Sequence, residues 1–494
     1  MGIDSSAIAR VVGVTTEFED LRDASVLFLP QRIAVFAQGA TAVTFATTKK
    51  QVTSAKQVGD TYGYGSPAHL IARELFPVNG DGVGTIPVTI YPLEDDGGGA
   101  ASAGDITPSG AATSAEEYRV RVNGILSSGF TIPVGAVVVA TVVAQIVAAV
   151  NAVLEMPTIA TDGATVANFV SKWFGATAND IFMEIIGPSA GVTFAITQHV
   201  GGTVNPSLTA ALAQVGNIWE TIGINQMEFD DAVTLDELSA FGEGRWGAIV
   251  RKPMVFCYGN TEIDQPTAVS VTSTRGTDRT NVQLVAPGSV NLEFVVAARE
   301  VARVARVANS NPPTDYGSQR ATGLIPGLDG DQWDYPTRDA AVKGGSSTVE
   351  VVDSVVNMAD TITMYAPVGE TPPAYRYVVD IVKLQQIHFN VALIFATPEW
   401  DGAPLIPDDQ PTVNPNAKTP KQAKAEIAGL IDALALQAII SDPAKAKKSI
   451  TAVINSQNPK RLDIVFTVQL SGNSNIIDVT LKFGFFFGAQ AAAA

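Results

Sequence analysis

Short, fully apolar runs recur through the first two thirds of the 494-residue chain, and such runs are typical of strands buried on both faces of a sheet. We expect strands of this kind at residues 32–37, 86–91, 253–258 and 281–286. Apolar residues at helical spacing predict helices between them, at 66–76, 235–241 and 291–309. Strands that alternate with helices predict an α/β domain.

Two breaks in composition interrupt this pattern. Residues 94–104 are acidic and rich in Gly, Ala and Ser, which predicts a linker, and residues 201–206 form a second break. Strand-like segments lie between the two breaks, at 118–122 and 192–196. We therefore expect a β-rich domain at 100–204, inserted into an exposed loop of the α/β domain, where insertions cost little.

One uncharged stretch, from Val122 to Leu154, is long enough to be tested as a membrane span. Pro133, Gly135 and Asn151 interrupt it, and no basic cluster flanks it. We interpret this stretch as a buried strand followed by a buried helix, because it lacks the flanking charges of a membrane helix.

The last third of the chain has its own signals. Apolar residues at helical spacing from Tyr377 onward give way to an apolar run at 389–395, which we interpret as a helix-to-strand region. Thr419 followed by Pro420 predicts the start of a helix, because threonine caps helix starts and proline fits the first turn. Apolar residues recur along one side of this helix up to about residue 440.

The chain closes with two segments of alternating apolar residues, 462–470 and 477–485, with turn residues between them. This pattern predicts an antiparallel hairpin with one buried face. The aromatic run at 483–488 has little charge to guard it, and an open strand edge pairs readily with another chain. A short extended segment also precedes the first domain. We expect strand exchange between subunits through Val11, Val12, Val14, Val479, Leu481, Phe483, Phe485 and Phe487.

These elements predict a multidomain chain of the mixed α/β or α+β class. The expected parts are an N-terminal arm at 1–25, a central α/β domain at 26–99 plus 205–350, a β-rich inserted domain at 100–204, a C-terminal mixed-sheet domain at 351–480 and a C-terminal arm at 481–494.

Charge narrows the range of partners. The net charge is −17, and no stripe of Lys and Arg is present to neutralise phosphates, so we expect no direct contact with nucleic acid and no membrane insertion. Arg299, Arg303 and Arg306 share one face of the predicted helix 291–309. They would either pair with an acidic neighbouring subunit or remain in solvent.

Candidate chemistry is sparse. Cys257 lies in an apolar run that favours a buried, inert thiol, and a single cysteine suits a reducing cytoplasm. His69, His199 and His388 lie far apart and match no zinc pattern. Because phosphate-binding and nucleophile motifs are missing, we expect no cofactor, no metal and no enzymatic activity. An α/β enzyme remains an alternative, since carboxylate pairs meet only in the fold.

The C-terminal region resembles the C-terminal domain of contractile tail sheath proteins of myophages. The segments that carry the resemblance are the helix at 420–440, the strands at 462–470 and 476–487, and the link Asn455–Pro459. The start of the chain is similar too, with Arg10–Thr15 in place of the family's usual opening, although Val12 stands where the family has proline. The insertion at 100–204 resembles this family in kind, since sheath proteins carry variable outer domains.

The resemblance implies a structural subunit that polymerises as stacked hexameric rings around a tail tube and contracts to drive the tube through the bacterial envelope during genome delivery. It implies as partners copies of the chain itself, the tail tube protein, and baseplate and tail terminator proteins. The implied location is the virion tail, after assembly in the host cytoplasm, with the C-terminal domain facing the tube. A surface-layer or capsid-associated subunit is the alternative among assembly proteins.

Overall fold

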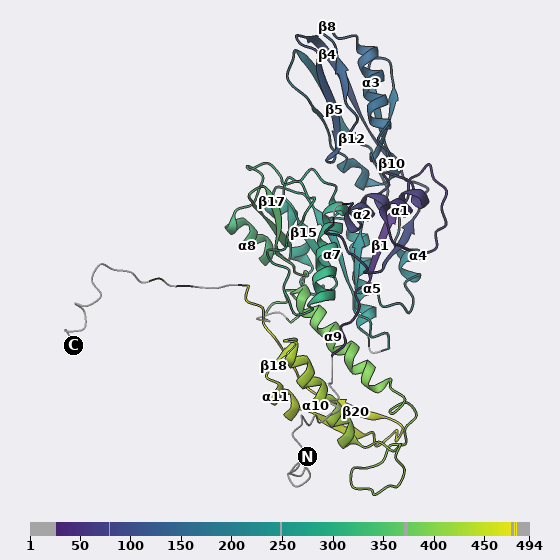
Figure 1. Ribbon diagram of the computed structural model, residues 1–494, viewed down its shortest axis with the longest axis vertical. Coiled ribbons are helices and arrows are strands. Elements are labelled where there is room, and N and C mark those ends of the chain that lie inside the picture. The colour runs from purple at the N-terminus through teal and green to yellow at the C-terminus, as the bar shows by residue number, and fades with distance from the viewer. Residues whose placement is uncertain are drawn as a thin grey trace, which may run out of the picture. The chain divides into compact units, whose positions relative to one another are not determined.

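The computed structural model describes residues 26–78, 80–247, 249–369, 374–475, 479 and 481. The chain forms two compact units, one of Phe28–Ala392 together with Leu470 onward, and one that includes Leu393–Gln469 (Figure 1). Helices and several separate sheets occur in succession, so the prediction of a mixed α/β chain is confirmed.

An eight-stranded sheet forms the centre of the larger unit (Figure 1). Its strand order is β17-β16-β15-β14-β13-β1-β3-β2. The strands from β16 to β3 run parallel, whereas β17 and β2 are antiparallel at the two edges. The strands are β1 Ile33–Gln38, β2 Lys50–Val52, β3 Val88–Leu93, β13 Ile222–Asn225, β14 Val255–Asn260, β15 Asn281–Val285, β16 Ser347–Val352 and β17 Val355–Asp360.

Helices cover both faces of this sheet, which explains why its central strands are buried along their whole length. One face carries α1 (Ala55–Tyr62), α2 (Pro67–Leu75) and α7 (Glu293–Ser310). The opposite face carries α4 (Thr209–Ala213) and α5 (Ala232–Trp246). The predicted helices at 66–76, 235–241 and 291–309 are therefore confirmed as α2, α5 and α7. The shorter elements of this region are α6 Gln265–Ala268, η2 Thr272–Thr274 and α8 Tyr335–Lys343.

Between β3 and β13 the chain forms two antiparallel sheets and a helix, α3 (Val139–Asn151). The larger sheet has the order β12-β4-β10-β9 with β8 also on β4, and the smaller has the order β11-β5-β6 with β7 also on β5. The elements are β4 Ala101–Ala112, β5 Glu116–Val122, β6 Ile125–Leu126, β7 Phe130–Ile132, β8 Gly135–Ala136, β9 Thr158–Asp162, β10 Ala167–Phe174, η1 Ala176–Asp180, β11 Met183–Ile186 and β12 Val192–Val200.

Helix α3 buries Val143, Ile146 and Val150, so the uncharged stretch from Val122 to Leu154 does contain a partly buried helix. Three short strands precede that helix where the sequence predicted one. The alternation of apolar residues is too brief in each of them to mark separate strands.

The insertion is seated on the carboxyl ends of the parallel strands. The indole of Trp173 is fully buried and packs edge-on against Phe294 of α7, with ring centroids 6.0 Å apart. The Asp95 carboxylate accepts hydrogen bonds from Gln38 Nε2 at 2.6 Å and from Phe174 N at 3.2 Å. Residues 94–104 are therefore not the loose linker that their composition predicted, because Asp95 is bonded on both sides of the junction and β4 begins at Ala101.

The central sheet also continues past residue 350, the boundary expected from the sequence. Strands β16 and β17 straddle that boundary and pair with each other, and β16 pairs with β15. The second compact unit begins only at Leu393. The apolar run at 389–395 belongs to one continuous helix, α9 (Val378–Phe395), so the expected change from helix to strand at His388 was wrong. A short apolar run does not distinguish the two states by periodicity.

The smaller unit is built around α10 (Pro420–Leu436), which packs against α11 (Pro443–Lys448) and β19 (Thr451–Ile454). Thr419 caps α10, as the sequence predicted, and its hydroxyl and the Gln422 side chain bond each other's backbone in a capping box. Strand β20 (Leu462–Val465) pairs antiparallel with β19. A second pair joins β18 (Ile440–Ser441) to β21 (Gln469–Leu470).

The predicted hairpin of 462–470 with 477–485 therefore differs from the structure. The first segment is split into β20 and β21, and both pair with strands that precede them. The Asn455 side chain accepts hydrogen bonds from the backbone N–H groups of Gln457 and Asn458, which forms the turn that brings β20 back onto β19. Most of 477–485 lies outside the described residues.

Truncation of the buried indole tests the seating of the insertion. We expect Trp173→Ala to lower the free energy of unfolding by about 3–5 kcal/mol, because it leaves a cavity against Phe294. Val170→Ala on the same strand is the matched control, since Val170 is 40% exposed and its loss costs little. Urea denaturation, monitored by far-ultraviolet circular dichroism so that the signal does not depend on tryptophan, measures both free energies of unfolding. Equal losses of stability in the two variants would contradict this packing.

Candidate assembly site

The residues predicted to exchange strands lie at the two ends of the chain. Val11, Val12, Val14, Phe483, Phe485 and Phe487 lie outside the described residues. Val479 and Leu481 are described, belong to no strand, and are 77% and 80% exposed. Strand exchange through these eight positions stays a prediction, and the described structure bears on it through the segments where the two ends leave the fold.

The N-terminal end joins the larger unit just before β1. The backbone N–H of Leu29, a buried residue, donates to Oε1 of Gln386 on α9 at 2.7 Å. Two residues later, Gln31 N donates to Oδ1 of Asn309, near the end of α7, at 3.2 Å. This segment, which we call the N-terminal root (residues 28–31), is thus fixed to two helices of the larger unit.

After β21 the chain rejoins the larger unit. The Nζ of Lys383 on α9 donates to the carbonyl oxygen of Ser471 at 2.6 Å and to Oδ1 of Asn473 at 2.7 Å. Asn473 Nδ2 in turn donates to the carbonyl oxygen of Pro313 at 2.7 Å. This segment, the C-terminal root (residues 470–475), is held by the same helix that holds the N-terminal root.

The smaller unit offers open strand edges. Strands β19 and β20 form a sheet of only two strands, and in the part of the chain that the structure describes no third strand is bonded to either edge. Asn455 N donates to Arg461 O at 2.8 Å, which makes this pair of opposite residues a hydrogen-bonded one. In an antiparallel ladder such pairs alternate with pairs whose backbone groups point away from the partner strand, and 454/462 and 452/464 are pairs of the second kind. By that alternation the backbone groups of Ile454 and Ile464 point outward. The pair can accept a strand on each side.

The three arginines of α7 all form ion pairs within the chain, although the Arg306 side chain is still half exposed to solvent. Arg299 forms an ion pair with Glu74 of α2, and its side chain is almost fully buried. Arg303 and Arg306 both reach Oδ1 of Asp81, at 2.9 and 3.1 Å. Asp81 sits in a tight turn with a φ of 64°, between glycines that allow such a turn. These pairs fix α7 to α2 and the following turn.

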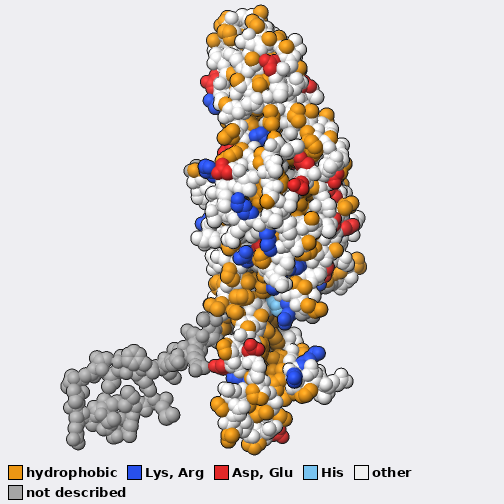
Figure 2. All heavy atoms as spheres, turned by 90° about the vertical axis from the view of Figure 1, so that its right-hand side faces the viewer, with side chains coloured by type: hydrophobic (Ala, Val, Ile, Leu, Met, Phe, Trp, Pro, Cys, Tyr) orange, Lys and Arg blue, Asp and Glu red, His pale blue; other side chains and the backbone are white. Residues whose placement is uncertain are grey.

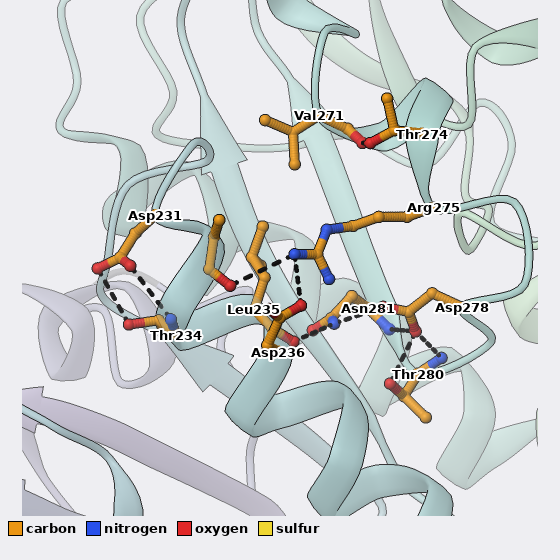
Figure 3. A network of polar contacts seen from close by, with 11 residues as sticks. Asp231, Thr234, Leu235, Asp236, Val271, Thr274, Arg275, Asp278, Thr280 and Asn281 are labelled. Carbon is orange, nitrogen blue, oxygen red and sulfur yellow. Dashed lines mark hydrogen bonds and ion pairs between the residues drawn. The ribbon is translucent and has the colours of Figure 1, made fainter.

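The groove between α5 and the loop after η2 is the place where an enzyme site would be sought, and it encloses about 630 Å³. Figure 3 shows its polar network: Arg275 pairs with Asp236 at 2.7 Å, and the Asp278 carboxylate accepts from Thr280 and Asn281. Arg279 is held between the rings of Trp246 and Tyr375. The carboxylates that line this groove, Asp236, Glu243 and Asp278, each have a structural partner.

Burial sets the protonation state of two histidines and of the cysteine. Burial lowers the pKa values of His69 and His199 to about 4, so both are neutral at pH 7. The Cys257 thiol is fully buried, and burial raises its pKa well above the usual range, as the prediction of an inert thiol requires. No group of three or more His, Cys, Asp or Glu residues that could hold a metal ion occurs within the described ranges.

Two surface properties complete the picture. On the face shown in Figure 2, Lys and Arg side chains are scattered among acidic ones and form no stripe. Among the described helices, α9 alone has the length and hydropathy to cross a membrane, and half of it is buried within the protein. That burial is also what a helix packed in a protein interior shows.

The fold and the site together define a class: a multidomain α/β chain with an inserted β domain, two anchored ends and open strand edges. The comparisons fall in this class. The tail sheath protein of the Mu-like prophage FluMu of Haemophilus influenzae is 24% identical over 416 residues, which cover 81% of this chain and 82% of that protein. No family model matches the chain.

Solved structures are similar to the chain as well. The crystal structure of a sheath tail protein from Listeria innocua has a TM-score of 0.50 at 12% identity, over 90% of this chain and 93% of that one. A sheath tail protein from Desulfitobacterium hafniense has a TM-score of 0.47 at 12% identity, over 93% and 100%. The resemblance to contractile tail sheath proteins that the sequence indicated is confirmed, with the Listeria structure sharing the fold and the Haemophilus protein sharing sequence.

The buried thiol gives a test of the site's inertness. We expect Cys257 to react with a thiol reagent about 100-fold or more slowly in the native chain than in the chain unfolded in urea, because reaction requires opening of β14. Absorbance after addition of Ellman's reagent measures both rates. If the native chain reacted as fast as the unfolded chain, the cysteine would be accessible, and a role as a nucleophile would have to be considered again.

Proposed function

We propose that this chain is a structural, non-enzymatic subunit of a contractile tail sheath. Copies would polymerise as stacked hexameric rings around a tail tube and contract to drive the tube through the bacterial envelope during genome delivery. The observation that carries the proposal is the similarity to the FluMu tail sheath protein over four fifths of the chain, together with a shared fold in the Listeria sheath tail protein.

The two chain ends would connect neighbouring subunits. Val479 and Leu481 are apolar and exposed, and an exposed apolar row needs a partner to cover it. In an extended strand these residues share a face with Phe483, Phe485 and Phe487, because successive side chains alternate. Burial against a neighbouring copy would contribute about 1.5–3 kcal/mol for each large apolar side chain, and each backbone hydrogen bond about 1 kcal/mol more.

The open pair β19–β20 is the natural acceptor for such a strand. Val453 and Val465 on this pair are 57% and 65% exposed, so added strands would also cover apolar side chains of the acceptor. The resulting mesh would let domains move as rigid bodies while the chain stays connected. In this arrangement the smaller unit faces the tube and the insertion projects outward.

Other partners follow from the role. The sheath would contact the tail tube protein along its inner face and baseplate and tail terminator proteins at its ends, within a virion tail assembled in the host cytoplasm. Contraction would draw its energy from new contacts between subunits, so that no nucleotide or metal takes part. An acidic surface would keep unassembled subunits apart, and added salt would weaken that repulsion.

Deletion of the ends tests the connection between copies. We expect chains that lack residues 1–18 or 483–494 to remain folded and to stay monomeric, because the strands offered to neighbours are gone. Negative-stain microscopy and gel filtration of each variant beside the full chain give the readout. Cylinders of normal diameter from either truncated chain would contradict the arm as a connector, while flat sheets from the full chain would favour a surface-layer protein.

Proline substitution tests the acceptor edges one at a time. We expect Ile464→Pro or Ile454→Pro to block assembly without unfolding the unit, because each removes an outward N–H and leaves the β19–β20 bonds in place. Ile464→Ala and Ile454→Ala are the matched controls, since they shorten the side chain and keep the N–H. Circular dichroism checks the fold. Normal cylinders from both proline variants would refute strand addition at this pair.

A further inference from the structure

Two side chains on one turn of α9 hold both ends of the chain. Lys383 and Gln386 are both fully buried, and residues three apart share a helix face. Gln386 accepts the N–H of Leu29 in the N-terminal root, and Lys383 donates to Ser471 and Asn473 in the C-terminal root. The two roots are separated by more than 430 residues in sequence, and a single helical turn fastens both of them.

The contact at Lys383 is more than incidental packing. Its ammonium carries three N–H donors, and all three are used, on Asp380 at 3.0 Å, on Ser471 and on Asn473. A buried charge is tolerated only when it is paired and fully hydrogen-bonded. Two of the three acceptors come from the C-terminal root, so departure of that root would leave a buried ammonium without two of its partners.

The same turn is tied to the central sheet. Gln385, between the two anchoring residues, donates from Nε2 to the carbonyl oxygens of Pro253 at 3.0 Å and Thr221 at 3.4 Å. Those residues lead directly into β14 and β13. The two roots are also tied near the end of α7, at Asn309 and Pro313.

We propose that the turn Lys383–Gln386 is a shared anchor that transmits displacement of either chain end to the central sheet. This inference rests on the proposed function, in which each end pairs with a neighbouring copy. The distance from Asn473 to Val479 is about six residues, a reach of ~20 Å when extended. Release of Asn473 and Ser471 from Lys383 would lengthen the free C-terminal segment by about three residues, or ~10 Å. Displacement of that end would then reach α9 only after this extra length is fully extended.

Hydrogen exchange of the unassembled full-length chain tests the anchor itself. We expect Lys383→Met and Asn473→Ala each to speed exchange of the amides in residues 470–475 by about 10-fold or more, and Gln386→Leu to do so at Leu29. Lys421→Met is the control, because this lysine is exposed on α10. Asn473→Ala leaves the interior of α9 intact, so it answers the question even when Lys383→Met does not fold.

The assembled state tests the transmission. We expect cylinders built from Asn473→Ala chains to dissociate at a lower urea concentration than those of the wild type or of Lys421→Met, because the slack end no longer holds neighbouring sheets in register. Unchanged exchange at 470–475 would overturn the anchor. Faster exchange with cylinders as resistant as the wild type would overturn the transmission. Failure of the wild type to form cylinders would overturn the proposed function, while the exchange rates would still decide the anchor.

Discussion

A parallel sheet that is buried on both faces leaves only the two ends of its strands free to receive other parts of the chain. The larger unit uses both ends. The insertion sits on the carboxyl ends, where Gln38 and Asp95 meet Phe174 and Trp173 packs on α7. Helix α9 covers the amino ends, where Gln385 bonds the entries to β13 and β14. The sheet thereby separates the inserted part of the chain from the part that holds the two roots.

The sequence predicted most of this centre, because strands buried on both faces and capped helices leave local signatures. Thr419 and Pro420 marked the start of α10, and apolar spacing placed α2 within a residue of its bounds. The insertion was visible as a change of composition. Sequence similarity to tail sheath proteins was visible only as a diffuse pattern, which the relative from Haemophilus influenzae makes specific.

What escaped prediction depends on partners far away in sequence. Alternation in 462–470 indicated a half-buried strand, but it carries no information on which strand lies beside it, and in the structure β20 pairs with β19. Arg299, Arg303 and Arg306 gave a correct helix face, yet Glu74 and Asp81 lie more than 200 residues away. Lys383 and Gln386 looked like ordinary polar positions of a helix, and only the folded chain shows that each is buried against a chain end.

The opposed placement of insertion and chain ends has a practical consequence for labelling. Both roots lie against α9, so a tag joined directly to either root would crowd any copy that approaches there. The turn at β8 lies at the tip of the insertion (Figure 1), and Val134, directly before β8, is 65% exposed. A small fluorophore or epitope placed there would sit on the far end of the domain from the sheet, so individual particles could be followed under the microscope while their assembly proceeds undisturbed.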